Sequence, residues 1–249
     1  MKAELIPPVL GTDLDVVDAA RVSFNKTSDW GFPCEYSEDI KAAPCEDCTC
    51  SGRQEGLLST RDQKLIRYLA AHGHWSPFAH CYAKFRCVAP IFVARQLGKH
   101  QVGLAWNEVS RRYVDVGVDI WTPGDKWRKQ SEDKKQGSSD DLVQTMRLKT
   151  AEGTSGFLPV EKYYKDSVAL AVDTYFSMLS AGVCEEQARA VLPQGAHTEW
   201  IWSGSLYAFS RVANQRLSPD AQKETAELVQ QISEALEHHF PVSWVALTK

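Results

Sequence analysis

The longest periodic stretch of the sequence runs from about residue 160 to residue 181. Its apolar side chains recur at helical spacing: Tyr164, Val168, Val172, Tyr175 and Leu179. Side chains three or four residues apart share one face of a helix, and such a face packs against other apolar surface. The stretch therefore predicts a long amphipathic helix, which Gly182 ends.

Shorter helices are predicted before this stretch. Residues 13–24 carry apolar residues at helical spacing, and Ser59 with Asp62 three residues later forms a capping box for a helix that Gly73 ends. Helical spacing returns over residues 91–101, after a proline that suits a first turn. The first half of the chain is thus expected to be rich in helix.

The C-terminal third is also predicted to be helical. A short helix carrying Arg189 ends before Pro193, a second covers about residues 198–215, and the last begins at Ser218-Pro219-Asp220 and ends near His238. Residues 81–89 instead alternate apolar and polar side chains, as a strand with one buried face does. No Gly/Ser/Pro linker separates two cores, so we expect one α+β domain over residues 1–249.

Composition excludes several classes of protein. Of the 249 residues, 43% are hydrophobic and 24% are charged, unlike disordered, collagen or coiled-coil chains. The formal net charge is −4, so bulk charge does not draw the chain to DNA or to an anionic membrane. No apolar run approaches the roughly 18–20 residues of a membrane span, and residues 1–10 do not resemble a secretory signal. We therefore expect a cytoplasmic protein without a membrane or nucleic-acid polymer as partner.

Residues 24–58 differ from the rest of the chain, being rich in Gly, Pro and Ser and poor in aliphatic residues, and are predicted to be an insertion. Four cysteines lie in them: Cys34, Cys45, Cys48 and Cys50. Four thiols in a reducing compartment suit either a structural Zn²⁺ or a loop of reduced cysteines, and the sequence leaves both open. The remaining cysteines lie in apolar segments and are expected to be buried: Cys81, Cys87 and Cys184.

Residues 128–141 contain no apolar side chain. Such a segment is typical of a solvated loop or a mobile lid. The sequence leaves open whether the wider segment 114–158 closes over a substrate.

Positive charge is concentrated in residues 95–112, which hold four Lys or Arg residues against one acidic residue. On an otherwise acidic chain, this strip favours a small anionic ligand over a polyanion. Four residues of the strip would share one face of a helix: Gln96, Lys99, His100 and Gly103. In an extended segment Ser110 and Arg112 would point the same way and could bind a phosphate monoester. The alternative is a solvated helix face with surface ion pairs.

Five separated segments carry a further signal. In chain order they are HGHWSPFAH at 72–80, APIFVARQLGKHQ at 89–101, NEVSRRY at 107–113, ARAVLP at 188–193 and NQR at 214–216. Together they resemble the flavin-dependent thymidylate synthase (ThyX) family, whose signature is Arg-His-Arg, a few residues, then Asn-Glu-x-Ser-x-Arg-Tyr. One extra residue precedes the Asn-Glu pair here. Four residues depart from the common family pattern: Lys99 and Gln101 for two arginines, Ser205 for Asn and Tyr207 for Arg.

The resemblance implies a fold and a reaction. The fold would be helix-rich α+β with a small antiparallel sheet. The enzyme would methylate dUMP at uracil C5 to give dTMP, with 5,10-methylenetetrahydrofolate as carbon donor and NADPH as reductant through FAD, and without a cysteine nucleophile. It would be a homotetramer whose active sites and FAD are shared between subunits.

The resemblance also implies a nucleotide site. Eight residues match dUMP-binding positions: Gln96, Lys99, Glu108, Ser110, Arg111, Arg112, Arg189 and Arg216. Ser110 and Arg112 would hold the 5′-phosphate, with Arg111 adding its backbone N–H. Arg216 would be the catalytic residue, because a fixed cation at the uracil stabilises the negative charge of the activated ring. Without the resemblance, Arg216 would be a cation favoured by a helix C-terminus, and Arg189 a surface ion pair.

Nine residues match flavin-binding positions: His74, Ser76, Lys99, His100, Gln101, Glu108, Ser205, Tyr207 and Arg211. Tyr207 could stack on an aromatic ring where a guanidinium would normally bond, and His74 would pack at the flavin near the folate site. The alternative for the histidines of residues 72–80 is a structural role or zinc binding, although their spacing suits no common catalytic zinc motif.

Two other functions remain open. The replacements at Lys99 and Gln101 suit a nucleotide-binding module that binds dUMP but makes no dTMP, because lysine keeps the charge of arginine but loses its bidentate fork. The cysteines and the basic strip suit a zinc-stabilised nucleic-acid binder, whose polynucleotide affinity would depend steeply on salt. The acidic remainder of the chain argues against the second.

Overall fold

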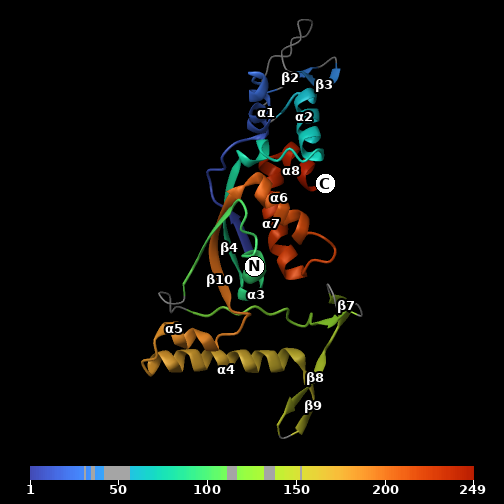
Figure 1. Cartoon of the computed structure of the whole chain (residues 1–249). Helices are drawn as coiled ribbons and strands as arrows, with labels where there is room; N and C mark the ends of the chain where they lie inside the picture. Colours follow the sequence, from blue (N-terminus) through green and yellow to red (C-terminus); the bar gives the residue numbers. More distant parts are fainter. Residues whose placement is uncertain (31, 35–36, 42–56, 111–116, 132–137, 152) are drawn as a thin grey trace.

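The structure is a computed structural model of the whole chain, shown in Figure 1. It describes residues 1–30, 32–34, 37–41, 57–110, 117–131, 138–151 and 153–249. The helices are α1 (Asp13–Arg21), α2 (Thr60–Ala71), α3 (Ile91–Leu97), α4 (Val160–Ser180), α5 (Glu185–Ala188), α6 (Leu206–Arg216), α7 (Lys223–His239) and α8 (Pro241–Thr248). Short 3₁₀ turns are η1 (Val22–Phe24), η2 (Pro77–Ala79) and η3 (Arg189–Val191).

The strands are β1 (Lys2–Leu5), β2 (Phe32–Cys34), β3 (Ser37–Lys41), β4 (Tyr82–Pro90), β5 (Leu104–Glu108), β6 (Arg128–Gln130), β7 (Ser138–Leu142), β8 (Thr145–Thr150), β9 (Gly153–Pro159) and β10 (His197–Ser205). The elements are spread along an elongated molecule, with the C-terminal helices back in its middle beside β4 (Figure 1). We call β1, β4, β5, β10, α3, α6, α7 and α8 the body, and α4, α5, η3, β8 and β9 the arm. In Figure 1 the arm lies at the lower end and α1, α2, β2 and β3 at the upper end.

The body is built on a four-stranded sheet with the order β1-β4-β10-β5. All three pairings are antiparallel. Alternate side chains of β4 and β10 are buried, and Trp202 lies opposite Phe85 in register. The small antiparallel sheet and the strand over residues 81–89 are therefore confirmed.

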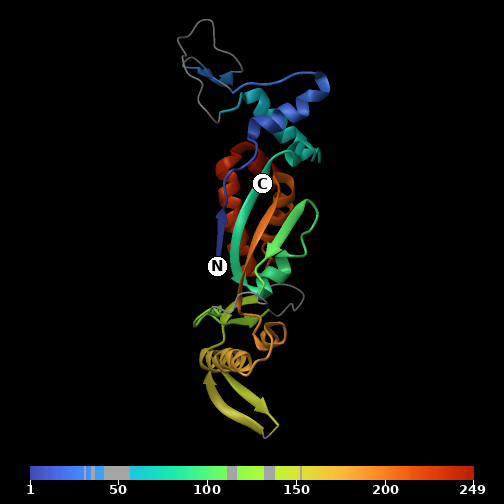
Figure 2. The same cartoon turned by 90° about the vertical axis from the view of Figure 1, so that its left-hand side faces the viewer.

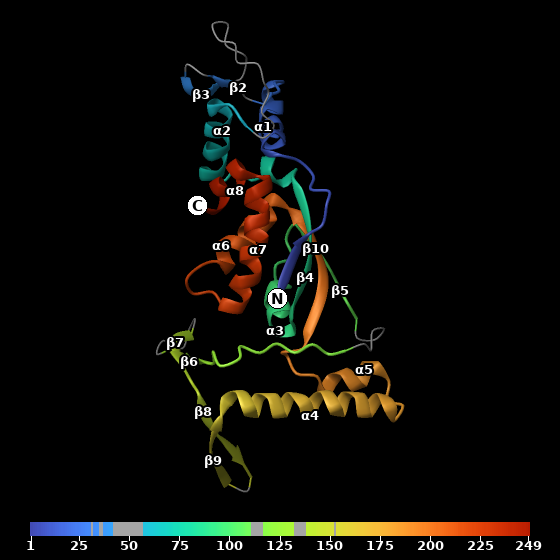
Figure 3. The same ribbon diagram turned by 180° about the vertical axis from the view of Figure 1, so that it is seen from behind.

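Helices α6, α7 and α8 lie on one side of this sheet (Figures 2 and 3). The Phe209 ring packs edge-on against Phe85 and Trp202, with ring centroids 5.3 and 5.4 Å away, and all three side chains are buried. Trp244 of α8 is buried too, and its Nε1 donates to Ser233 Oγ at 2.9 Å. Burial of these aromatic side chains gives the body a hydrophobic core of its own.

Several predicted helices are confirmed. The Ser59 hydroxyl accepts a hydrogen bond from the Asp62 N–H at 3.1 Å, and Gly73, with φ of +71°, follows α2. The prediction over residues 13–24 corresponds to α1 and η1, and that over residues 160–181 to α4. The short helix at Arg189 is formed by α5 and η3.

The predicted helix over residues 198–215 is wrong in its first half. Residues 197–205 form β10, and α6 begins only at Leu206. Thr198, Trp200 and Trp202 are buried, whereas Glu199 and Ile201 between them are half-buried. Burial thus alternates with a period of two, and tryptophans pack well on a sheet. Both features favour a strand over a helix here.

The predicted helix face in the basic strip is wrong. α3 ends at Leu97, so Lys99 and His100 lie in the turn that follows and do not share a helix face with Gln96. Gly103 has φ of +78°, and a Cβ there would lie 3.0 Å from the Ala208 Cβ. The glycine therefore allows close packing on α6 rather than the approach of a ligand.

The predicted start of the last long helix, at Ser218, is wrong. Gln222 is the N-cap of α7, which begins at Lys223. Residues 218–221 form a turn, in which the Ala221 N–H donates to the Ser218 carbonyl at 2.9 Å. A serine and a proline suit such a turn as well as a helix start, so the pattern did not separate the two.

The hydrophobic stripe of α4 is only partly covered. Tyr175 is buried, whereas Tyr164, Val168, Val172 and Leu179 are half-buried. Outside this stripe, Leu170 of α4 is 69% exposed and Phe157 of β9 is 63% exposed. The arm therefore presents apolar side chains that the described residues of this chain leave uncovered.

Within the described residues, no helix is both long and apolar enough to cross a membrane. A cytoplasmic location stays a prediction. Cys81 and Cys87 are buried as expected, and burial raises the pKa of each thiol to about 12. Cys184 is exposed, because it lies in the turn between α4 and α5, so that prediction is wrong.

Three cysteines of the predicted insertion lie outside the described residues: Cys45, Cys48 and Cys50. The fourth, Cys34, ends β2, which pairs with β3. Both interpretations of this cluster therefore remain open.

Candidate active site

Arg216, at the C-terminal end of α6, reaches the turn that follows α3. Its Nε donates to His100 Nε2 at 3.0 Å, and its Nη2 donates to the Gln96 backbone carbonyl at 3.4 Å. These partners lie 116 and 120 positions away in the sequence. The tertiary structure thus brings the basic strip and Arg216 together.

The contact fixes the chemical form of His100. Burial lowers the pKa of this imidazole, and the positive charges of Arg216 and Arg211 lower it further. Because Nε2 accepts from Arg216, the proton of the neutral ring lies on Nδ1. Burial also lowers the pKa of Arg216, but an arginine remains charged in proteins. The pair therefore combines a fixed cation with an imidazole N–H donor.

A cavity of about 830 Å³ lies beside this pair. Its lining includes five residues that the sequence assigns to dUMP or flavin: Gln96, Lys99, His100, Gln101 and Glu108. Arg216 lines a second cavity of about 630 Å³, and Gln96 lines both. Gln96 and the Arg216–His100 pair therefore lie where the two cavities meet.

Glu108 is held by two residues that the sequence did not single out. Its Oε1 accepts from Thr198 Oγ1 at 2.7 Å, and its Oε2 accepts from Trp106 Nε1 at 3.2 Å. The Trp106 ring also lines the cavity and stacks on Trp200, with ring centroids 4.4 Å apart. Trp106 lies two residues before Glu108, so strand alternation could have placed both side chains on one face.

Three predicted flavin residues belong to α6 and its N-cap. The Ser205 hydroxyl accepts from the Ala208 N–H at 3.2 Å, so this side chain caps the helix. Tyr207, one turn before Arg211, packs beside Trp75, with ring centroids 6.0 Å apart. Since Arg211 acts electrostatically on His100, the exposed side of α6 connects the His100 turn to the segment around Trp75.

That segment carries His74 and Ser76, which are both exposed. Tyr68 stacks on His72 and on His74, with ring centroids 4.0 and 6.3 Å away. His72 Nδ1 also lies 2.8 Å from the Tyr68 carbonyl oxygen. Among the described residues, no group of three or more potential ligands could hold a metal ion. His72 and His74 thus contact the Tyr68 ring, and the flavin role expected of His74 stays a prediction.

One predicted nucleotide residue, Arg189, lies outside this cluster. Arg189 lies in η3, packed against α4, and its Nε donates to the Glu186 carbonyl at 3.3 Å. Ser110 lies just beyond β5. Arg111 and Arg112 lie outside the described residues.

Comparison with known proteins identifies the family of this chain. The family described as "Thymidylate synthase complementing protein" matches residues 4–242. A flavin-dependent thymidylate synthase from Thermus thermophilus is 34% identical over 193 residues, which cover 77% of this chain and 66% of that protein's length. The chain belongs to the flavin-dependent thymidylate synthase family.

Other members of the family match along almost the whole chain. The flavin-dependent thymidylate synthase of Kosmotoga olearia is 31% identical over 242 residues, covering 96% of this chain and 86% of the relative. A solved structure, the UMP/dUMP methylase PolB from Streptomyces cacaoi bound with 5-Br dUMP, has a TM-score of 0.71. It is 25% identical in sequence and covers 99% of this chain and 94% of its own. The expected α+β fold of this family is confirmed.

The residues of the candidate site suit FAD, the cofactor of the family. FAD presents a flat aromatic ring with hydrogen-bonding edges and a negatively charged diphosphate. The large cavity offers an indole face at Trp106, an imidazole N–H at His100 and a cation at Lys99. Arg211 adds a second cation beside His100. This set of donors and rings matches both parts of the cofactor.

Proposed function

We propose that this chain makes dTMP from dUMP, with 5,10-methylenetetrahydrofolate as carbon donor and NADPH as reductant. The observation that carries the proposal is the Arg216–His100 contact of 3.0 Å at the cavity lined by the family's signature residues. Family membership supplies the reaction, and this contact supplies a cation beside the proposed nucleotide site.

FAD, when bound, would carry electrons from NADPH to the methylene group that becomes the new methyl. Nine side chains would hold it: His74, Ser76, Lys99, His100, Gln101, Glu108, Ser205, Tyr207 and Arg211. His100 is suited to donate from Nδ1, because its Nε2 already accepts from Arg216. Lys99 and Arg211 supply positive charge for the diphosphate.

Arg216 would be the catalytic residue. Its guanidinium, fixed by His100 and the Gln96 carbonyl, would stabilise the negative charge that develops on the uracil when C5 becomes nucleophilic. Partial burial strengthens this effect, since charges interact more strongly away from water. No step requires a cysteine, and the described thiols with raised pKa, Cys81 and Cys87, lie in the core.

Seven further residues would bind dUMP: Gln96, Lys99, Glu108, Ser110, Arg111, Arg112 and Arg189. Ser110 and Arg112 would hold the 5′-phosphate. Thr198 and Trp106 orient the Glu108 carboxylate, whose oxygens each retain acceptor capacity for a ligand.

The proposal includes a homotetramer. Leu170 and Phe157 are mostly exposed, and oligomerisation would cover apolar surface of this kind. Arg189 belongs to the arm, away from Gln96, so in an assembly it would serve the site of another subunit. Sites shared between subunits would account for the separation of Arg189 from the other proposed nucleotide residues.

We also propose that residues 1–249 form one functional domain, with an insertion at about residues 24–58. The family match runs continuously over residues 4–242, which supports a single unit. Tetrahydrofolate would be a product, and the folate would bind near His74.

The test is an NADPH-oxidation assay on the purified full-length chain, with product analysis for dTMP. We expect yellow protein, flavin absorbance that bleaches with NADPH under anaerobic conditions, and dTMP only when dUMP and methylenetetrahydrofolate are both present. UMP is the matched alternative substrate, because the solved neighbour is a UMP/dUMP methylase. Binding of dUMP without NADPH oxidation or dTMP formation would instead establish the module without turnover, which the replacements at Lys99 and Gln101 motivate.

A further inference from the structure

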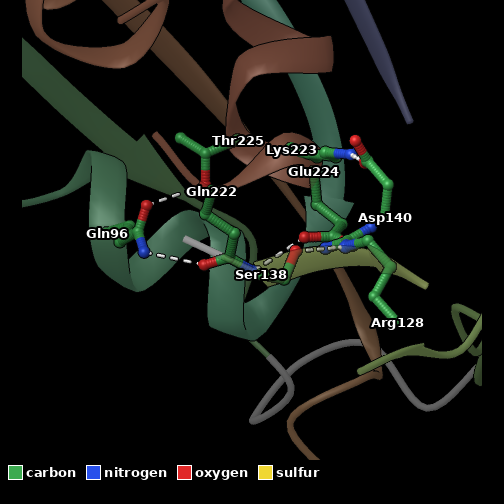
Figure 4. Close-up of polar contacts among 8 residues, drawn as sticks. All are labelled: Gln96, Arg128, Ser138, Asp140, Gln222, Lys223, Glu224 and Thr225. Carbon is green, nitrogen blue, oxygen red and sulfur yellow. Dashed lines mark hydrogen bonds and ion pairs between the residues drawn. The ribbon is translucent and has the colours of Figure 1, made fainter. Parts of the chain in front are cut away.

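The β6–β7 hairpin docks on the N-terminal end of α7, beside the candidate site (Figure 4). Two ion pairs make this joint. Arg128 Nη2 donates to Glu224 Oε1 at 2.7 Å, and Lys223 pairs with Asp140. The side chains of the first pair are 24% and 9% exposed, whereas those of the second are 53% and 90% exposed. Only the Arg128–Glu224 pair is therefore protected from water.

A chain of hydrogen bonds leads from the buried pair to Gln96 (Figure 4). Gln222 Nε2 donates to Glu224 Oε2 at 3.0 Å, and Gln96 Nε2 donates to Gln222 Oε1 at 2.7 Å. On the other side of the same amide, Thr225 Oγ1 donates to Gln96 Oε1 at 2.8 Å. The Arg128 Nε also donates to Ser138 Oγ at 2.7 Å, which ties β7 to this chain of contacts.

These contacts determine which way the Gln96 amide points. Gln222 offers Gln96 an acceptor because its own amide nitrogen is turned to Glu224. Each contact uses one of the two N–H groups or one of the two oxygen lone pairs of Gln96. The Gln96 amide therefore retains one N–H group and one oxygen lone pair for a ligand. Gln222 and Thr225 set the directions in which these two groups point.

The charge on Glu224 maintains this arrangement. Burial by itself raises the pKa of Glu224, but hydrogen bonds from its own backbone and from Gln222, together with Arg128, outweigh burial and lower it. Without Arg128, a carboxylate that is 9% exposed would lose its counter-ion. A buried charge left without its partner is strongly unfavourable, so the neighbouring amides would rearrange to compensate.

We propose that Arg128 is a positioning residue for dUMP, which acts through Glu224 and Gln222 to fix the amide of Gln96. The proposal rests on the assignment of Gln96 to the nucleotide site under the proposed function. It makes the β6–β7 hairpin, whose sequence suggests a solvated loop or lid, a support of the nucleotide site.

The test compares dUMP dissociation constants, measured by calorimetry on the full-length, FAD-loaded protein. Arg128→Met removes the charge and keeps much of the side chain, and we expect about tenfold weaker dUMP binding, equivalent to about 1.4 kcal/mol. Glu224→Gln, which keeps the shape, should give a similar loss, and Arg128→Lys should recover most of the affinity. FAD content should stay at the level of the parent protein in all three variants.

Asp140→Asn is the matched control, because it breaks an ion pair between the same hairpin and the same helix and Asp140, 90% exposed, does not line the cavity that Gln96 and Arg216 share. We expect dUMP affinity to be unchanged. An equal loss in Asp140→Asn and Arg128→Met would mean that docking of the hairpin matters rather than the orientation of Gln96, and would overturn the proposal.

A double mutant separates this inference from the proposed function. Gln96→Ala alone should weaken dUMP binding, and adding Arg128→Met should then weaken it no further. Additive losses would show that Arg128 does not act through Gln96. Unchanged dUMP affinity in Gln96→Ala would remove Gln96 from the nucleotide site and overturn this proposal, while dTMP formation by the parent protein would leave the proposed function standing.

Discussion

The body and the arm differ in how far their apolar side chains are buried. In the body, Trp202, Phe85 and Phe209 are buried by the strands and helices of the same chain. In the arm, Tyr175 is the buried residue of a 21-residue helix, and Leu170 is 69% exposed. The body can therefore be explained as a folded unit of one chain, whereas the arm leaves apolar side chains exposed that the proposed homotetramer would cover.

The two regions are joined by aromatic side chains. The Trp121 ring packs edge-on against Phe92 of α3, with ring centroids 5.1 Å apart. The Tyr164 hydroxyl of α4 donates to the Trp121 carbonyl at 2.5 Å, and its ring lies 4.9 Å from that of Trp127. The position of the arm is thus set on the helix whose last turn carries Gln96.

The largest expected effect is on the core of the body. Trp202→Ala should lower the free energy of unfolding by roughly 3–5 kcal/mol, because a fully buried ring is removed from a packed site. Urea denaturation at fixed protein concentration measures this change. Leu170→Ala in the arm is the comparison variant: its loss should come from weaker assembly and so depend on protein concentration, whereas that of Trp202→Ala should not. Equal losses in the two variants would remove the distinction between body and arm.

The second prediction concerns catalysis on the body. Arg216→Ala should lower kcat for dTMP formation by about 10²–10³-fold, since a fixed cation at the developing charge is lost. Bound FAD should remain largely intact, as measured by flavin absorbance per chain. Arg67→Ala, on the exposed side of α2, is the matched arginine control and should turn over normally. Normal turnover by Arg216→Ala would refute its catalytic assignment.

The third prediction concerns assembly through the arm. Leu170→Ala should weaken the oligomer by roughly 1.5–3 kcal/mol if the side chain is buried between subunits, a ten- to hundredfold rise in the dissociation constant. Analytical ultracentrifugation across a dilution series measures this shift. Lys165→Ala, on the other side of α4, removes only an exposed i,i+4 pair with Glu161 and should leave the assembly unchanged. A parent protein that stays monomeric would contradict the role given to the arm.

The smallest effect is expected on the titration of His100. Its pKa is lowered by burial first, then by Arg216 and Arg211, so Arg216→Ala should raise it and Arg211→Ala should raise it less. The folded state disfavours the protonated ring. The resulting loss of stability is absent above the ordinary pKa of 6.5 and grows as pH falls from there to the folded pKa. NMR titration of the imidazole measures both shifts, and an unchanged pKa in Arg216→Ala would mean that the two side chains do not interact in solution.

Local signals in the sequence predicted local structure well. Ser59 and Asp62 set the start of α2 because a cap requires only neighbouring residues. The alternation over residues 81–89 predicted β4 for the same reason. The same approach failed for β10, because the spacing of Trp200 and Trp202 fits both a helix and a strand. The segment forms a strand because it pairs with β4 and β5.

The candidate site divides in a similar way. The family motifs predicted that Gln96, His100 and Arg216 belong to one site, and the structure brings these three together. Trp106 and Thr198 were missed, because their role is to hold Glu108 and not to carry a motif. The roles assigned to Arg111, Arg112 and Arg189 stay predictions.

The sequence by itself determined the capped helix α2, the strand β4 and the long helix α4, because each depends on residues close together in the chain. It also determined the family to which the chain is similar, because the family motifs can be read in order. Only the tertiary structure decided that Arg216 contacts His100 across 116 positions, and that Arg128 connects through Glu224 to Gln96. Such contacts depend on how separate elements pack, and the same polar side chain is equally compatible with solvent until that packing gives it a partner.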